Sequence, residues 1–187
     1  MINKWNFQTP SEEELHKRDQ LVAELGFSPV ICLLLVQRGI TSIEEAKKFF
    51  KPSLNDLHDP FLMPDMDKAV RRLNKALGNK EKILIYGDYD VDGTTAVSLV
   101  FKYLRPYSST LDFYIPDRYD EGYGISYKGI DYAAENGVSL VISLDCGIKA
   151  IEKIEYAKEK GIDFIICDHH MPDTTLPDAV AVLDAKR

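Results

Sequence analysis

The chain has 187 residues, of which 45% are hydrophobic and 28% charged, and its net charge is −7. This composition is typical of globular proteins, and no apolar run approaches the roughly 20 residues that a membrane-spanning helix needs, so we expect a cytoplasmic protein with no membrane partner. The acidic surplus lies in residues 81–187, which carry 11 basic and 19 acidic side chains, against 12 and 11 in residues 1–80. Surplus acid argues against a nucleic-acid partner, unless the carboxylates converge on cations that reverse the local sign.

The first part of the chain is predicted to be helical. Ser11 with Glu14 predicts a capping box at the start of one helix, and Thr41 with Glu44 predicts a capping box at the start of another. A loop with three prolines follows, and then an amphipathic helix over 65–78. These signals predict a helical leader rather than a sheet.

From Lys82 the pattern changes to short apolar runs that alternate with helical stretches. Four runs predict buried parallel strands, "KILIYGD", "LDFYIPD", "SLVISLD" and "DFIICDHH", and "AVAVLDA" predicts a fifth. The fold class is therefore α/β, with a parallel doubly wound sheet of about five strands flanked by helices. We predict two domains: a helical N-terminal leader (1–80) packed on the core, and an α/β catalytic domain (81–187).

The strands of the predicted sheet end in polar residues. These are Asp88, Asp90 and Asp92 after the first, Asp117 and Arg118 after the second, Asp145 after the third, and Asp168, His169 and His170 after the fourth. Because the carboxyl ends of parallel strands share one edge, where ligands bind, we expect these side chains to meet there. Each motif alone also suits a turn, a helix cap or an exposed histidine pair. The convergence of three strand ends favours a functional site.

So many carboxylates at close range need cations, because like charges raise each other's pKa. Oxygen and imidazole donors without thiolates favour Mn²⁺ or Mg²⁺ over Zn²⁺ or Fe²⁺. Two ions about 4 Å apart, as in many phosphoester hydrolases, would suit this number of ligands. Neighbouring strand residues point to opposite faces, so the strand must break near Asp168 or the rings of His169 and His170 must serve different roles.

The motifs "GDYDVDG", "EGYG", "SLDCG" and "DHH", in this order, resemble those of the DHH phosphoesterase superfamily. Together with the helical leader, they make nearly the whole chain similar to the RecJ family of single-strand-specific exonucleases. The resemblance implies metal-dependent hydrolysis of single-stranded DNA from the 5′ end, with release of mononucleotides, in DNA repair and recombination.

The resemblance also implies roles for individual residues. It implies a metal-ligand set of Asp88, Asp90, Asp92, Asp145 and His169, with Asp88 either a ligand or an acceptor behind the ligands. It implies a catalytic set of Asp90, Asp92, Asp145, His169 and His170. It implies substrate contacts at Arg118, Tyr123, Gly124 and His170, and an orienting role for Asp168. Independently of the resemblance, the turn that contains Thr94 could present amide hydrogens to a phosphate at a helix start.

The chain departs from the family pattern after the histidine motif. The family continues with a further aspartate motif, a second domain and a nucleic-acid-binding module, so we expect a catalytic domain truncated at its C-terminus. One metal ligand would then be missing, and this fragment could be inactive.

Alternative activities remain open within the superfamily and outside it. An oligoribonuclease, a cyclic-dinucleotide phosphodiesterase or a pyrophosphatase would use the same motifs. The resemblance disfavours a pyrophosphatase, which is expected to have a histidine where this chain has Tyr86. A non-catalytic replication scaffold is expected to lose motif residues that are all present here.

Overall fold

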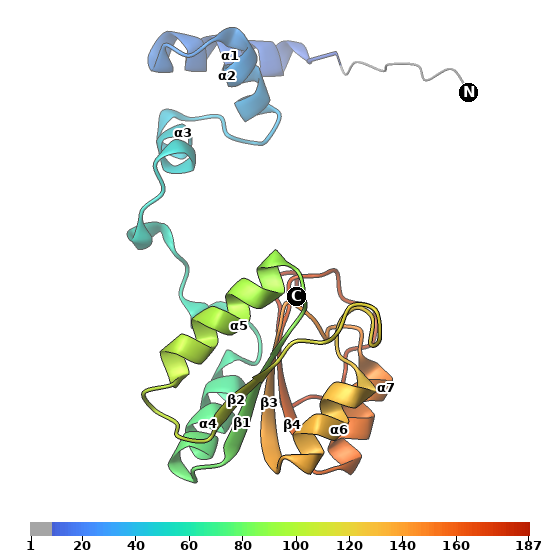
Figure 1. Ribbon diagram of the computed structural model, residues 1–187. Coiled ribbons are helices and arrows are strands. Elements are labelled where there is room, and N and C mark those ends of the chain that lie inside the picture. Colours follow the sequence, from blue (N-terminus) through green and yellow to red (C-terminus); the bar gives the residue numbers. More distant parts are fainter. Residues whose placement is uncertain (1–8) are drawn as a thin grey trace, which may run out of the picture. The chain divides into compact units, whose positions relative to one another are not determined.

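The computed structural model describes residues 9–187, and the chain divides into two compact units between His58 and Asp59. The unit before His58 is helical, and the unit from Asp59 is an α/β sandwich (Figure 1). The division lies before the last helix of the predicted leader, whereas the sequence placed it at residue 80. Packing explains the difference, because that helix buries Ala69 and Ala76 in the core of the α/β unit.

The helical unit contains α1 (Glu12–Leu25), α2 (Pro29–Val36), α3 (Ile43–Phe50) and the 3₁₀ turn η1 (Leu54–Asp56). Its core consists of Leu21, Cys32, Leu35, Val36 and Ala46. The capping box of Ser11 and Glu14 is confirmed, since the Ser11 amide donates to Glu14 Oε2 at 2.7 Å. The second capping box is shifted by one residue: Ser42, not Thr41, caps α3 and pairs with Glu45.

The α/β unit has a sheet of five parallel strands in the order β2-β1-β3-β4-β5. The strands are β1 (Lys82–Gly87), β2 (Leu111–Tyr114), β3 (Val138–Leu144), β4 (Asp163–Cys167) and β5 (Ala181–Leu183). The helices are η2 (Pro60–Leu62), α4 (Met66–Gly78), α5 (Val91–Leu104), α6 (Tyr127–Glu135) and α7 (Ile151–Glu159). This arrangement confirms the predicted fold class.

Helices cover both faces of the sheet (Figure 1). On one face, α4 and α5 pack on side chains such as Ile83 and Ile85; on the other, α6 and α7 pack on side chains such as Leu84 and Val141. Strand β1 lies between β2 and β3, so the chain runs outward in both directions from it. This reversal is the position at which open α/β sheets bind ligands beyond their carboxyl ends.

Helix α4 is tied to the sheet by Arg72. Its guanidinium donates to Asp163 Oδ2 at 2.5 Å and to Glu81 Oε2 at 2.7 Å, and its side chain is 10% exposed. Arginine side chains on surface helices are mostly solvated. Because the guanidinium instead lies against the amino ends of the strands, it serves the fold.

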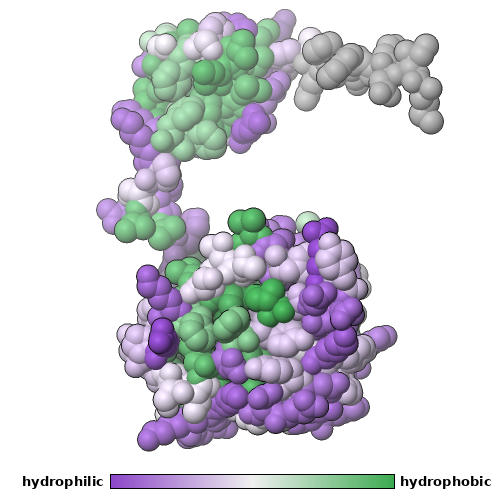
Figure 2. Space-filling model, in the orientation of Figure 1, coloured by the Kyte–Doolittle hydropathy of each residue, from purple (hydrophilic) through white to green (hydrophobic). Residues whose placement is uncertain are grey.

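Apolar side chains also lie on the surface of the α/β unit, where Figure 2 shows them over α5. Leu99 and Tyr103 of α5 and Phe113 of β2 are each more than half exposed. Among residues 9–187, no helix combines the length and the hydropathy that crossing a membrane requires.

Candidate metal centre at the sheet rim

A row of four aspartates follows the carboxyl ends of four adjacent strands. Gly87, Leu144, Cys167 and Leu183 are register partners across β1, β3, β4 and β5. The residue after each of them is an aspartate, and all four are buried: Asp88, Asp145, Asp168 and Asp184. The predicted convergence of strand ends is therefore seen in the register, although Asp184 was not singled out from the sequence.

Asp145 lies at the centre of this rim. It has a left-handed backbone conformation, with φ of 61°, which is uncommon for residues other than glycine. Its carboxylate Oδ1 lies 2.9 Å from His169 Nε2. Burial, followed by the charge of Asp90, raises the pKa of Asp145, so the buried carboxylate has too little compensating positive charge.

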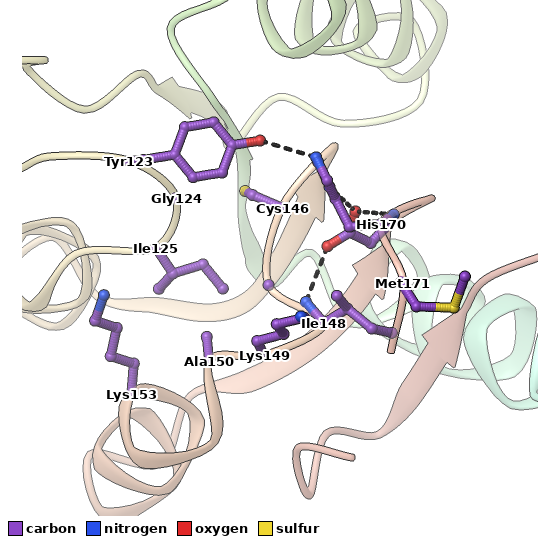
Figure 3. A pocket seen from close by; sticks show the side chains of 12 residues that line it. Tyr123, Gly124, Ile125, Cys146, Ile148, Lys149, Ala150, Lys153, His170 and Met171 are labelled. Atoms are coloured by element: carbon purple, nitrogen blue, oxygen red, sulfur yellow. Dashed lines mark hydrogen bonds and ion pairs between the residues drawn. The ribbon is translucent and has the colours of Figure 1, made fainter. Parts of the chain in front are cut away.

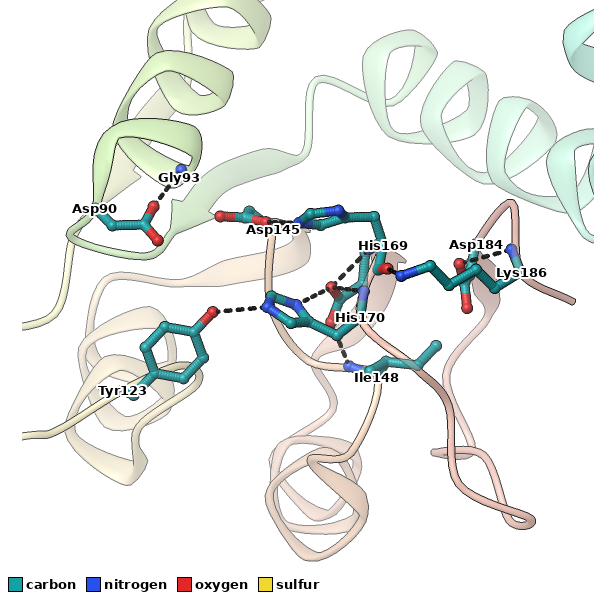
Figure 4. Close-up of polar contacts among 10 residues, drawn as sticks. Asp90, Gly93, Tyr123, Asp145, Ile148, His169, His170, Asp184 and Lys186 are labelled. Carbon is teal, nitrogen blue, oxygen red and sulfur yellow. Dashed lines mark hydrogen bonds and ion pairs between the residues drawn. The ribbon is translucent and has the colours of Figure 1, made fainter. Parts of the chain in front are cut away.

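Asp168 holds in place His169 and His170, the two histidines that Figure 4 shows beside Asp145. Its Oδ1 accepts hydrogen bonds from the amides of His169 at 2.7 Å and His170 at 3.1 Å, and its Oδ2 accepts from the Ile148 amide at 2.9 Å. Burial opposes ionisation, but these bonds outweigh it and lower the pKa of Asp168. This geometry matches the orienting role expected for Asp168.

The two histidine rings point to different partners. Strand β4 ends at Cys167, so the break expected near Asp168 is present. His170 Nδ1 lies 2.7 Å from the ionised Asp168 Oδ1, so a neutral His170 carries its proton on Nδ1, and Nε2 accepts from the Tyr123 hydroxyl at 3.2 Å. Asp145, His169 and His170 nevertheless each offer one donor atom within 4.8 Å of the others.

The aspartates of the first motif have three different environments. Asp88 is fully buried, and its Oδ2 has no hydrogen-bond partner among the described residues. Burial is the main cause that raises the pKa of Asp88, and the Tyr89 amide, which donates to Asp88 Oδ1 at 2.6 Å, offsets it in part. Asp90 caps α5, and Asp92 lies in the first turn of that helix.

A hollow of about 520 Å³ brings the first motif to the histidines. Asp92, Asp145 and His169 line it together, and Met63 and Met66 form part of its wall. Asp88, Asp90 and Asp92 lie outside the group of three donors within 4.8 Å of one another. The structure thus places Asp145, His169 and His170 at one point and the remaining predicted ligands around it.

Gly93 fixes the position of the first motif against the strand. A Cβ atom at this residue would lie 2.4 Å from the Asp88 carbonyl oxygen and 2.6 Å from the Asp88 amide nitrogen. No side chain fits at this position, so the absence of a Cβ lets the first turn of α5 pack directly against the Asp88 backbone. This contact sets where Asp90 and Asp92 stand relative to Asp88.

Three of the predicted substrate contacts, Arg118, Tyr123 and Gly124, lie in the loop between β2 and α6. Tyr123 is half exposed beside His170, and the Arg118 guanidinium lies 5.3 Å from the ring centre of Tyr89, which makes an edge contact with Tyr123. Gly124 lies next to Tyr123 with φ of 80°, and a side chain would be strained in that conformation.

The reason given for Thr94 was wrong. Helix α5 starts at Val91 rather than near Thr94, and the amides of Gly93 and Thr94 already donate to Asp90. These amides are occupied by the helix start and are not offered to a phosphate.

Sequence reasoning also missed Glu121, which shapes the loop that carries Tyr123. Glu121 accepts hydrogen bonds from the Tyr114 hydroxyl at 2.9 Å, from the Asp117 amide at 2.8 Å and from the Ser126 hydroxyl. Its position directly before the two glycines of "DEGYG" was a usable signal, because they mark a turn whose backbone amides need acceptors.

The donors at the rim fit a divalent cation. Oxygen and imidazole atoms meet there without a thiolate, one buried Asp88 oxygen has no hydrogen-bond partner among the described residues, and burial raises the pKa of Asp88 and Asp145. A hard cation relieves all of these conditions. Asp145, His169 and His170, whose donor atoms meet, are the residues best placed to hold it, and Asp88 lies in the same row of strand ends.

Comparison with known proteins gives matches over most of the chain. Residues 82–187 match the model of the "DHH family, N-terminal domain". The chain is 40% identical over 184 residues to the single-stranded-DNA-specific exonuclease RecJ of Bacillus subtilis, which covers 98% of this chain and 23% of that protein. It is 33% identical over 173 residues to RecJ of Escherichia coli, over 91% of this chain and 29% of that protein. The chain thus spans about a quarter of the length of these relatives.

Two solved structures resemble this chain. A crystal structure of exonuclease RecJ bound to manganese matches 67% of this chain and 32% of that one, with a TM-score of 0.61 and 28% identity. RecJ from Thermus thermophilus in complex with Mn²⁺ matches 91% of this chain and 23% of that one, with a TM-score of 0.67 and 24% identity, and at that identity it supports the fold alone.

Proposed function

The chain belongs to the DHH family, and on this premise we propose that it is a metal-dependent exonuclease that hydrolyses single-stranded DNA from the 5′ end and releases mononucleotides. The observation that carries the proposal is the rim itself, where Asp145, His169 and His170 offer donor atoms within 4.8 Å of one another. The relatives named as single-stranded-DNA-specific exonucleases give the substrate class. DNA repair and recombination in the cytoplasm are the processes in which such an enzyme would act.

Two Mn²⁺ or Mg²⁺ ions would be held by Asp88, Asp90, Asp92, Asp145 and His169. Bound cations supply Lewis-acid chemistry at a phosphodiester. Two ions are proposed because these donors come from two sides: the first motif leads into α5, and Asp145 and His169 follow β3 and β4. The carboxylates also have a deficit of positive charge, as the raised pKa of Asp88 and of Asp145 indicates.

His170 would move a proton to the leaving oxygen. The ionised Asp168 keeps a hydrogen on Nδ1 and stabilises the imidazolium, which leaves Nε2 to face the reacting group. Tyr123 occupies Nε2 in the present structure and would be exchanged for the phosphate when substrate binds. Arg118, exposed beside Tyr89, would contact a phosphate oxygen.

The test is digestion by the gene product at its full encoded length. With Mn²⁺, we expect mononucleotides from a single strand labelled at its 5′ end and little product from a duplex. Asp145→Asn should abolish digestion, whereas Asp178→Asn, at an exposed site paired with Lys158, should not. Equal digestion of duplex and single strand, or a preference for short RNA or a cyclic dinucleotide, would instead favour another activity of the superfamily. Full activity of Asp145→Asn would refute the metal centre.

A further inference from the structure

A second hollow lies next to the candidate metal centre, on the other side of His170. It has a volume of about 530 Å³, and its wall includes Ile125, Ile148 and Met171. This volume lies in the range of small-molecule sites, and such sites combine an apolar wall with a few polar groups. The roles considered above include Tyr123, Gly124 and His170 at one side of this pocket, and none includes its two lysines or its apolar wall.

The pocket adjoins the rim at the histidine motif, because Asp168 lines both hollows. His170 and Tyr123 line the pocket, whereas His169 lines the hollow that contains Asp92 and Asp145. The two imidazole rings lie 4.8 Å apart, centre to centre. A strand whose phosphate is at the rim therefore has its neighbouring sugar and base within reach of the pocket.

Two lysines face the pocket, although residues 81–187 carry more acidic than basic side chains. Lys149 and Lys153 line it, and Figure 3 shows Lys153 and His170 at opposite ends. Lys149 Nζ lies 3.4 Å from Asp173, and Lys153 has no ion-pair partner among residues 9–187. Helix α7 also begins at the pocket wall, and its cap residue Ala150 offers no side-chain acceptor to the first-turn amides. The lysines and the helix start favour an anion; Asp168 also lines the pocket, but its carboxylate accepts hydrogen bonds from the amides of Ile148, His169 and His170.

We propose that this pocket binds the nucleotide next to the cleaved phosphate, with its sugar and base against Ile125, Ile148 and Met171 and its phosphate facing Lys149 and Lys153. The inference rests on the proposed function for its substrate class. The apolar wall would contact the sugar and base. The two lysines would favour a nucleotide that carries a phosphate over a nucleoside. Lys149 and Lys153 are thus positioning residues for the strand.

The methionines of the chain give a direct test. Met171 lines the proposed pocket, whereas Met63 and Met66 line the hollow at the metal centre. Selective ¹³C labelling of methionine methyl groups therefore reports the two hollows separately in one spectrum. Titration of the metal-free chain with deoxythymidine 5′-monophosphate should shift the Met171 signal and leave Met63 and Met66 unchanged. Thymidine should shift it with lower affinity, and inorganic phosphate should hardly move it.

Substitution of the lysines tests the phosphate contact. Lys149→Gln with Lys153→Gln should weaken nucleotide binding roughly three- to tenfold, as expected for charged contacts at partly exposed sites. Lys158→Gln removes one positive charge from the helix that carries Lys153, at a site outside the pocket, and should change nothing. An unchanged Met171 signal, equal affinity in the lysine variant, or an equal response to phosphate alone would overturn the proposal.

The two proposals can fail separately. If the protein digests single strands but its Met171 signal does not respond to the nucleotide, the pocket proposal is wrong and the exonuclease proposal stands. Nucleotide binding that depends on the two lysines, in a protein that digests no DNA, would support the pocket and overturn the exonuclease.

Discussion

Replacing Asp168 with asparagine should destabilise the α/β unit strongly, although the change is nearly isosteric. The Asp168 side chain is 1% exposed and accepts four hydrogen bonds, from the amides of Ile148, His169 and His170 and from His170 Nδ1. An asparagine offers one accepting oxygen, so its amide group must face a donor. The best arrangement keeps the oxygen toward the histidines and leaves the Ile148 amide without a partner.

The expected loss follows from these bonds. A hydrogen bond to a buried charge contributes roughly 1.5–3 kcal/mol, and an unsatisfied buried amide costs about 1–3 kcal/mol. We therefore expect Asp168→Asn to lower the free energy of unfolding by about 2–4 kcal/mol. Urea unfolding followed through the methyl signal of Met66, which lies in the α/β unit, measures this value.

Asp184→Asn is the matched control. Asp184 follows the neighbouring strand and is equally buried, but its Oδ1 accepts from the Lys186 amide at 2.9 Å and its Oδ2 has no partner among the described residues. Asparagine keeps the one bond and removes a buried charge, so the unfolding free energy should stay within about 0.5 kcal/mol or rise. If the two variants are destabilised equally, hydrogen bonding is not what distinguishes these aspartates, and the reasoning fails.

Three further changes test other parts of the structure. Gly93→Ala places a Cβ against the Asp88 backbone at 2.4 Å, so we expect a loss of about 3 kcal/mol or more in thermal unfolding; wild-type stability would show that α5 can shift freely. Asp145→Asn should abolish the broadening of nearby methyl signals by Mn²⁺; retained broadening would place the ion elsewhere. The hydrogen bond from Ser139 is the main cause that lowers the pKa of Glu81 from its usual 4.5, so Glu81 stabilises the fold above pH 4.5 and this contribution is lost as the pH falls below it. Glu81→Gln should therefore cost about 1 kcal/mol at pH 7 and much less at pH 3, and a cost independent of pH would contradict the assignment.

The fold and the rim could be predicted from the sequence because each rests on a local pattern. Apolar runs that end in aspartate mark buried strands and their carboxyl ends, and the parallel sheet then brings Asp88, Asp145 and Asp168 into one row. The alternation of strand side chains left two alternatives, a break near Asp168 or different roles for His169 and His170, and the strand does end at Cys167. These inferences need only the period of a strand and the direction of a parallel sheet.

The contacts that could not be predicted depend on the exact path of loops. Thr41 with Glu44 and Ser42 with Glu45 are both capping boxes by spacing, and only the loop before α3 selects the second. Arg72 lies on a helix that also carries solvated bases such as Arg71, and its partners are Asp163 at the start of β4 and Glu81 just before β1. The pocket beside His170 likewise requires loop coordinates, because Lys149 and Met171 come from different strand ends.

The four-aspartate row has a consequence for how the protein responds to metal supply. Its members Asp88 and Asp145 are proposed ligands, and with His169 they follow β1, β3 and β4, which come together only when the chain folds, so an unfolded chain would have no binding site to offer. Cation binding and global folding are then thermodynamically linked, and an ion at 100 times its dissociation constant adds about 2.7 kcal/mol to native stability. Removing the ion with a chelator would remove catalytic activity and also part of the stability that protects the protein from proteases. Metal starvation would therefore lower the amount of the protein as well as its catalytic rate.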